Sequence, residues 1–454
     1  MIKSAAASAL TALVLLAGCA DKSANFGEGD PDGTSSTLAD GGWIGGAPDM
    51  SDADSASKGG GGVATEAADS AGATEIADRS AASEAAPLGG APMTSVAPDA
   101  GPLRAGNVDD NADHDGFIAY LARVSASGVP HRPLDVSGRV VVTVRGAAGL
   151  PASGVEVQVA EGGRTIATLR TTADGTARFH PLAYGAGDGP FTFSVGNASA
   201  EGAAGTTVDL TVPDQAAVER VPLDIAFAID VTGSMGDELA RLKDSVASVV
   251  ERIEALPGDP DVRLAMTIYR DEGDSFVTAT HDFTSDIGAF RSALAEVEAG
   301  GGGDWPEALD EAMDEVLAKP AWRPAGEATQ LVFVVGDAGG HPERQVARPY
   351  TESMKDAAAR GIKIIPIATS STDDQAEVAF RQMAQFTGGR FLFLAYGAGG
   401  AATGSSTDIG PTDYEELSLD DLVVRLVADE LAARTGTAVT PPTVATTTTQ
   451  PAGQ

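Results

Sequence analysis

The sequence has one cysteine, few aromatic residues and few basic residues. A single cysteine among 454 residues excludes an intrachain disulfide and a cysteine-based metal cluster. Aromatic residues make up 5% of the chain, against 55 glycines and 25 prolines, so a good part of it lacks the apolar bulk of a packed core. With 30 basic and 65 acidic residues the formal net charge is −35, which argues against nucleic acid as a partner and against electrostatic docking on anionic lipid.

The N-terminal residues 1–18 have the pattern of a secretion signal, with a basic start and a short apolar run at 12–17. This run is shorter than the ~20 residues of a membrane-spanning helix. The segment Leu16-Ala17-Gly18-Cys19 resembles the lipobox of bacterial lipoproteins. The resemblance implies that Cys19 carries a lipid anchor and that the protein lies in the cell envelope. Since Ala20 rather than Asp follows, it favours the outer membrane, periplasmic or surface-exposed. The alternative is an ordinary secretory signal with a chance cysteine.

Three further segments differ in composition. Residues 19–115 are rich in Gly, Ala, Ser and Asp without periodicity, which predicts a long disordered tether. A short apolar patch over 117–124 has helical spacing. Residues 134–214 alternate apolar and polar positions between turn signals, which predicts a small antiparallel all-β sandwich. Part of this segment resembles carboxypeptidase-regulatory-like and bacterial Ig-like modules. The Thr/Pro-rich tail, 436–454, is expected to be disordered.

Residues 220–435 alternate apolar strands with longer helical patterns. Continuous apolar strands bounded by helices predict an α/β domain with a doubly wound, mostly parallel sheet covered on both faces. Such sheets bind ligands beyond the carboxyl ends of their strands. The expected strands are 223–229, 262–269, 276–283, 331–335, 362–368 and 390–394, and the expected helices are 235–253, 286–297, 306–317, 350–360, 374–386 and 414–432.

Asp230, Thr232 and Ser234 lie where the first of these strands meets the first helix. Alternate residues of a tight loop can point the same way, which would bring a carboxylate and two hydroxyls together. Hard oxygen ligands of this kind suit Mg²⁺, Mn²⁺ or Ca²⁺ rather than zinc. The alternative is helix capping, in which a hydroxyl satisfies free backbone N–H groups.

Two later segments add carboxylates to this candidate site. A glycine run at 300–303 leads into Asp304, and the apolar strand 331–335 is followed by Asp337. The three segments, in this order, resemble the metal-ion-dependent adhesion site of von Willebrand factor type A domains, and the flanking segments 223–229 and 362–369 also fit.

The resemblance implies that Thr232 and Ser234 coordinate the cation directly, while Asp230 and Asp337 act mainly through water or hydrogen bonds. Adhesive members of the family have a threonine where this chain has Asp304. A carboxylate there would hold the cation more tightly and weaken its attraction for an incoming acidic ligand.

Nearby residues have weaker claims on function. Glu307 is either a further ligand or a residue that favours the start of a helix. His341 either lines the rim of the site or is an ordinary loop residue, and the turn at 271–274 is either a second cation site or a charged hairpin. Trp305 either contacts a partner or packs on the glycine loop.

These features predict a membrane-anchored binding protein, for adhesion or as an envelope scaffold, that captures an unidentified protein or glycan through a divalent cation. We expect no catalysis, because no serine elbow, zinc helix motif or phosphate loop accompanies the candidate site. The alternatives are a metal-dependent hydrolase that uses the same carboxylates and a structural spacer with a vestigial site.

Overall fold

A computed structural model of the chain describes residues 103–216, 218, 220–303, 305–369, 372–396, 401–402 and 414–437. The predicted signal segment 1–18, Cys19, most of the predicted tether, Asp304 and the tail beyond 437 lie outside these described residues. No helix within them is long and apolar enough to cross a membrane.

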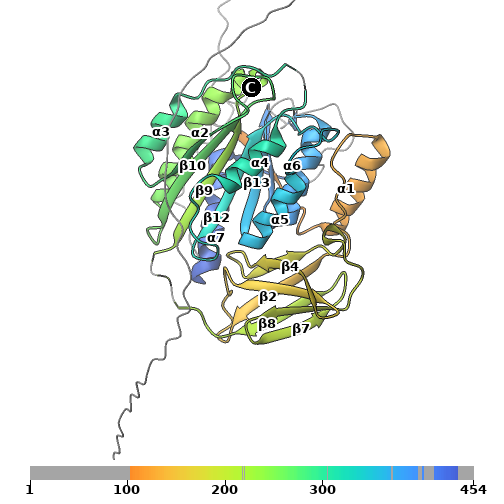
Figure 1. The fold of residues 1–454 in the computed structure, drawn as a ribbon. Helices are drawn as coiled ribbons and strands as arrows, with labels where there is room; N and C mark the ends of the chain where they lie inside the picture. Colours follow the sequence, from red (N-terminus) through yellow and green to blue (C-terminus); the bar gives the residue numbers. More distant parts are fainter. Residues whose placement is uncertain are drawn as a thin grey trace, which may run out of the picture. The chain divides into compact units, whose positions relative to one another are not determined.

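A large, mostly parallel sheet organises the molecule (Figure 1). Its strand order is β11-β10-β9-β12-β13-β14-β1-β16, with β15 paired to β14. The five neighbouring strands β10, β9, β12, β13 and β14 run parallel to one another. The remaining pairs are antiparallel: β11 with β10, β1 with β14, β16 with β1 and β15 with β14. This confirms the predicted α/β class. The bounds are β9 Pro222–Asp230, β10 Asp261–Tyr269, β11 Thr278–Thr284, β12 Thr329–Gly336, β13 Ile362–Ala368, β14 Phe391–Tyr396, β15 Ala401–Ala402, β1 Arg104–Val108 and β16 Glu415–Ser418.

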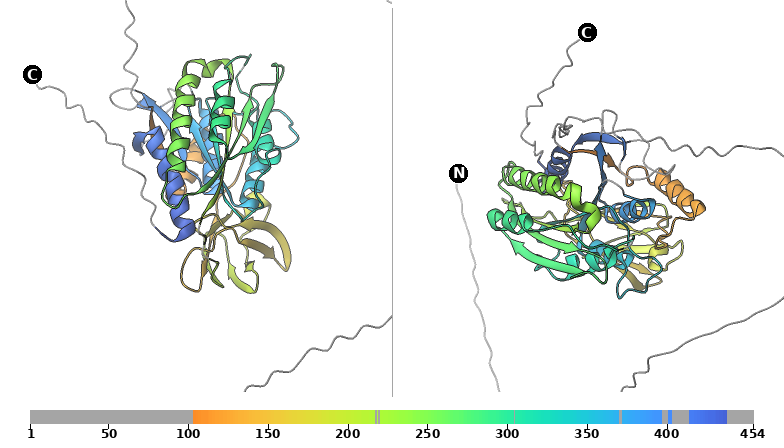
Figure 2. Two further views of the ribbon diagram at one scale, coloured as in Figure 1. Left: turned by 90° about the vertical axis from the view of Figure 1, so that its left-hand side faces the viewer. Right: turned by 90° about the horizontal axis from the view of Figure 1, so that it is seen from above.

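Helices cover both faces of the sheet, as Figure 2 shows from above. Every residue of β12 is buried, and its side chains alternate between two cores: Phe333 packs into one, Val332 and Val334 into the other. This two-sided burial explains why the strand reads as a continuous apolar run. One face carries α2 Gly236–Glu254, α3 Ile287–Ala295 and α7 Leu419–Thr435; the other carries α1 His114–Ser127, α4 Leu309–Ala318, α5 Tyr350–Arg360 and α6 Asp374–Thr387.

The sheet extends beyond the segment that its periodicity predicted. Residues 103–115, assigned from composition to the tether, form β1 and the start of α1, which includes the predicted helical patch over 117–124. β1 pairs with β14 and β16, and these partners are about 300 residues away in sequence. Its sequence, Arg-Ala-Gly-Asn-Val, does not alternate apolar and polar residues. The segment forms a strand because its backbone pairs with these two distant strands.

Two helix starts also differ from the sequence prediction. The helix expected from residue 414 begins at Leu419, because 415–418 pair with β1 as β16, and the Ser418 hydroxyl then caps α7 by accepting from Asp421 N. The helix expected from residue 306 begins at Leu309. The residues before it are held by tertiary contacts instead: the Glu307 N–H donates to the Gly339 carbonyl at 2.9 Å.

A small β-unit is inserted between α1 and β9. It consists of two sheets, of order β5-β2-β8 and β4-β3-β6-β7, which share one apolar core. The alternating burial agrees with the predicted period, but β2 and β8 run parallel where an antiparallel arrangement was expected. The strands are β2 Val140–Gly146, β3 Glu156–Glu161, β4 Arg164–Arg170, β5 Thr176–Phe179, β6 Phe191–Val195, β7 Ala198–Gly202 and β8 Thr207–Val212.

Buried polar contacts join this β-unit to the large sheet. The ammonium of Lys363, on β13, lies 3.3 Å from an Asp174 oxygen in the β4–β5 turn and 2.6 Å from a Glu430 oxygen on α7. Arg434 donates to the Ser153 hydroxyl at 2.9 Å. Because Lys363 links Asp174 of the β-unit to Glu430 of α7, and Arg434 of α7 reaches Ser153, these contacts favour one fixed arrangement of the two parts.

Candidate metal centre

The candidate site lies at the carboxyl ends of β9 and β12. β9 has β10, its successor in the chain, on one side and β12 on the other, so the direction of winding reverses there. Helical crossovers leave this point to opposite faces, and sheets of this kind bind ligands at such a point. Asp230 is the last residue of β9, and Asp337 directly follows β12.

The loop after β9 gathers the three oxygen-bearing side chains that the motif predicted. Asp230 accepts from Thr232 twice through one carboxylate oxygen, from the backbone N–H at 2.9 Å and from the hydroxyl at 2.7 Å. The hydroxyl oxygens of Thr232 and Ser234 are 3.2 Å apart. Thr232 directly precedes a short 3-10 turn, Gly233–Met235, and its hydroxyl does not cap that turn. Helix α2 begins after Met235, which has no side-chain cap either. The capping interpretation is therefore wrong for Thr232.

Asp337 joins this group from the neighbouring strand. The Ser234 hydroxyl donates to its carboxylate at 3.2 Å, although the two residues are 103 positions apart. Asp230, Thr232, Ser234 and Asp337 thus form one chain of polar contacts. The glycine loop lies beside it, since Gly301 accepts from the Gly233 N–H at 3.1 Å. Asp304 lies outside the described residues.

The carboxylates of the site are buried, and the described residues place no compensating positive charge beside them. Burial raises the pKa of Asp230 to about 7, with a smaller contribution from Asp337, and burial raises the pKa of Asp337 itself to about 6. Burial, followed by repulsion from Asp230, raises the pKa of Glu307 to about 8. One oxygen of Asp230 and one of Glu307 are buried and find no hydrogen-bond partner among the described residues.

This arrangement fits a hard divalent cation. Removing carboxylates from water is costly unless a positive charge accompanies them, and unpartnered carboxylate oxygens beside two hydroxyls are suitable ligands for such an ion. The described residues hold no cluster of three or more His, Cys, Asp or Glu side chains arranged to bind a metal. A cation here would therefore depend on the hydroxyls of Thr232 and Ser234 as well as on carboxylates.

Tyr269 is a residue of the site that the sequence did not single out. It ends β10 directly opposite Asp230 in the parallel register and is fully buried. Its hydroxyl has no hydrogen-bond partner in the described ranges of the chain, and burial together with the charges of Asp230, Asp337 and Glu307 raises its pKa well above 10. The expected strand 262–269 already ended at this tyrosine. Aligning the carboxyl end of this strand with that of the strand ending at Asp230 would have placed Tyr269 beside Asp230.

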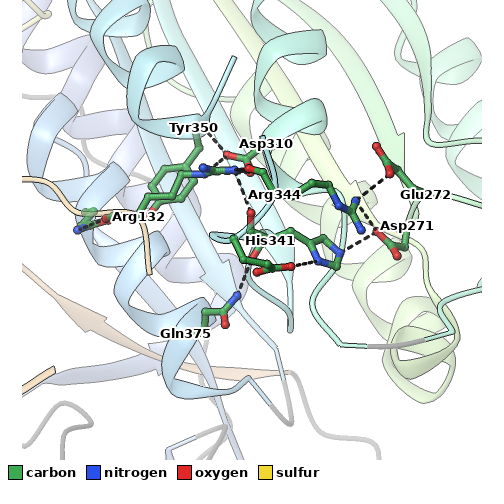
Figure 3. A network of polar contacts seen from close by, with 11 residues as sticks. Arg132, Asp271, Glu272, Asp310, His341, Arg344, Tyr350 and Gln375 are labelled. Atoms are coloured by element: carbon green, nitrogen blue, oxygen red, sulfur yellow. Dashed lines mark hydrogen bonds and ion pairs between the residues drawn. The ribbon is translucent and has the colours of Figure 1, made fainter. Parts of the chain in front are cut away.

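The rim of the site is a network of partnered charges (Figure 3). His341 is 4% exposed, and its two ring nitrogens lie 3.1 Å from oxygens of Asp271 and Glu343. Arg344 lies 3.2 Å from Glu272. Asp274 accepts from the Gly302 N–H at 2.8 Å. The acidic turn at 271–274 is thus occupied by protein partners, which favours the charged-turn interpretation over a second cation site.

Arg132 reaches this rim from the segment that precedes the β-unit. Its guanidinium binds the buried carboxylate of Asp310 at 2.5–3.1 Å and donates to the carbonyls of His341 and Arg344 (Figure 3). Asp310 also accepts from Tyr350 N at 2.7 Å. Arg132, which precedes the β-unit in the chain, therefore holds the loop that follows Asp337. The site residues themselves come from the segment after the β-unit.

Comparison with known proteins agrees with this geometry. Residues 224–395 match the von Willebrand factor type A domain, so such a domain is present in the chain. The match contains Asp230, Thr232, Ser234 and Asp337 and leaves out β1, α1, β16 and α7.

Curated proteins are similar to parts of the chain. An ariadne-like RING finger protein of Acanthamoeba polyphaga mimivirus is 27% identical over 188 residues, which is 38% of this chain and 18% of that protein. The alpha-protein kinase vwkA of Dictyostelium discoideum is 28% identical over 148 residues, 32% of this chain and 23% of that protein. The von Willebrand factor A domain-containing protein 7 of Rattus norvegicus is 34% identical over 93 residues, 20% of this chain and 10% of that protein. The similarity thus spans less than a quarter of each relative.

Proposed function

We propose that this protein is a binding module of the cell envelope that captures a protein or glycan partner at a divalent-cation site. A von Willebrand factor type A domain supports a protein-interaction or adhesion role. The observation that carries the proposal is the group of buried carboxylates and paired hydroxyls at the ends of β9 and β12. Within the described part of the chain no positive charge balances this group.

The roles of the residues follow from their contacts. A divalent cation supplies a positive centre that an oxygen of the partner can share. Thr232 and Ser234 present their hydroxyl oxygens to it, and Asp230 orients Thr232 by accepting from both its N–H and its hydroxyl. Asp337 orients Ser234 by accepting from its hydroxyl. Trp305 is 41% exposed and follows the glycine loop, so its ring offers a large apolar contact beside the site.

The test of cation dependence is calorimetric titration of the chain with Mg²⁺, Mn²⁺ and Ca²⁺. We expect binding that Ser234→Ala and Asp337→Ala abolish, with Ser292→Ala, a hydroxyl on α3 bonded to Gly288 O, as the matched control. Partner capture from envelope extracts should then depend on the cation and on the same two residues. No binding at millimolar metal would instead favour the spacer, and metal-dependent turnover of a substrate would favour a hydrolase.

We further propose that a lipid on Cys19 anchors the chain to the outer membrane. The Leu16-Ala17-Gly18-Cys19 sequence supports this. Metabolic labelling with a fatty-acid analogue in a bacterial host should mark the wild-type chain and not Cys19→Ser. Equal membrane association of both chains would refute the anchor.

A further inference from the structure

Glu307 occupies a position that its sequence context does not explain. It is 2% exposed, yet it lies before α4, which begins at Leu309 after an uncapped Ala308. Its carboxylate therefore neither caps the helix nor reaches solvent, and the described residues offer no partner to its buried Oε2. A buried carboxylate oxygen without a partner costs free energy unless something outside the chain occupies the space beside it.

The surroundings of Gly302 show which way this side chain points. A Cβ atom added at Gly302 would lie 2.8 Å from Glu307 Oε1 and 3.1 Å from Thr232 Cβ. The carboxylate and Thr232 therefore approach the same point of the glycine loop, which a larger residue would fill. The Glu307 N–H is bonded to Gly339 O, in the loop that follows Asp337. The backbone of Glu307 is thus held by the loop after Asp337, while its side chain points toward Thr232 and the glycine loop.

We propose that Glu307 is an internal ligand of the cation site, an inference that rests on the proposed function. Its carboxylate takes the place that an acidic side chain of a partner would otherwise occupy. The site then holds its cation when no partner is bound. Together with Asp230 and Asp337, Glu307 also more than offsets the charge of a divalent ion, so the site does not attract an acidic partner group.

Calorimetry of the full chain with Mn²⁺ tests the first half of this inference. Glu307→Gln should weaken Mn²⁺ binding about tenfold or more, because an amide oxygen is a poorer ligand than a carboxylate and brings no charge. Glu311→Gln, in the first turn of α4, is the matched control and should bind like the wild type. Equal affinity of Glu307→Gln and wild type would overturn the inference and leave the proposed function standing. No Mn²⁺ binding by the wild type would instead refute the proposed function.

Water relaxation on the Mn²⁺-loaded protein gives a second readout. If Glu307 is a direct ligand, Glu307→Ala should gain about one exchangeable water on the ion and should bind acetate, which the wild type should not. An unchanged water count, or acetate binding equal to that of the wild type, would overturn the inference. Circular dichroism of each variant verifies that the fold is retained.

Discussion

We expect the substitution Asp230→Asn to stabilise the cation-free protein at pH 8, although it removes a residue of the candidate site. Asp230 is fully buried, and no residue that the structure describes hydrogen-bonds to its Oδ2. Without a cation, the folded chain must therefore either protonate this carboxylate or keep an uncompensated charge in its interior. A neutral amide of the same shape removes that requirement.

The magnitude follows from the pKa of Asp230, which burial raises from 3.8 to about 7. Because the folded-state pKa is the higher one, the associated stability is complete below pH 3.8 and is lost as the pH rises to about 7. Each pKa unit corresponds to ~1.4 kcal/mol, so ionised Asp230 lowers the free energy of unfolding by about 4 kcal/mol at pH 8. The Asn oxygen still accepts from Thr232, but the new N–H at the Oδ2 position costs ~1–3 kcal/mol. The expected net gain is about 1–3 kcal/mol.

Urea unfolding in EDTA at pH 5 and pH 8 measures this difference, with the exposed Asp244→Asn on α2 as the control. At pH 5 protonating Asp230 on folding costs only about 1.6 kcal/mol, which the cost of the unpartnered amide N–H offsets, so the advantage should nearly vanish. With Mg²⁺ at a hundred times its dissociation constant, the wild type should gain about 3 kcal/mol and Asp230→Asn little. If Asp230→Asn were no more stable than the wild type in EDTA at pH 8, the reasoning from an uncompensated charge would be refuted.

Three further outcomes are expected. Arg132→Ala should destabilise the fold by ~3 kcal/mol, because it leaves the buried carboxylate of Asp310 without its guanidinium partner. It should also weaken Mn²⁺ binding, and an unchanged Mn²⁺ affinity in calorimetry would show that Arg132 does not position the site. Asp224→Ala removes a fully buried carboxylate that Arg263 and Arg323 bind, and should cost ~3–5 kcal/mol in urea unfolding without changing Mn²⁺ affinity once folded. A loss below ~1 kcal/mol would show that the two arginines do not depend on this carboxylate. Mg²⁺ affinity should rise between pH 6 and pH 8, because Asp230 and Glu307 have raised pKa values and must lose protons to bind it; a flat profile would show that neither titrates with binding.

The sequence alone predicted the α/β class and most of the candidate site, because both depend on patterns among residues that are close together in the chain. Apolar runs bounded by helical patterns predict a parallel sheet covered on both faces. The alternation of Asp230, Thr232 and Ser234 places three oxygens on one side of a short loop. Asp337, at the end of an apolar strand, could be expected at the same edge because the carboxyl ends of parallel strands lie together.

Only the tertiary structure decided what surrounds these residues. β1 and β16 are strands because they find backbone partners far away in the chain, and no local pattern encodes such pairing. His341 pairs with Asp271, and Arg132 reaches Asp310, through contacts between segments that are distant in sequence. Sequence composition identifies such charges but not their partners.

The same holds for Tyr269 and Glu307. A tyrosine at a strand end and a glutamate before a helix are ordinary in sequence, and each becomes a residue of the site only because packing removes it from water beside Asp230. Burial and the distance between charges determine whether a carboxylate is solvated, protonated or ready to bind a cation. Both are properties of the folded chain, so the sequence determined which oxygens were available and the tertiary structure decided which of them lack a partner.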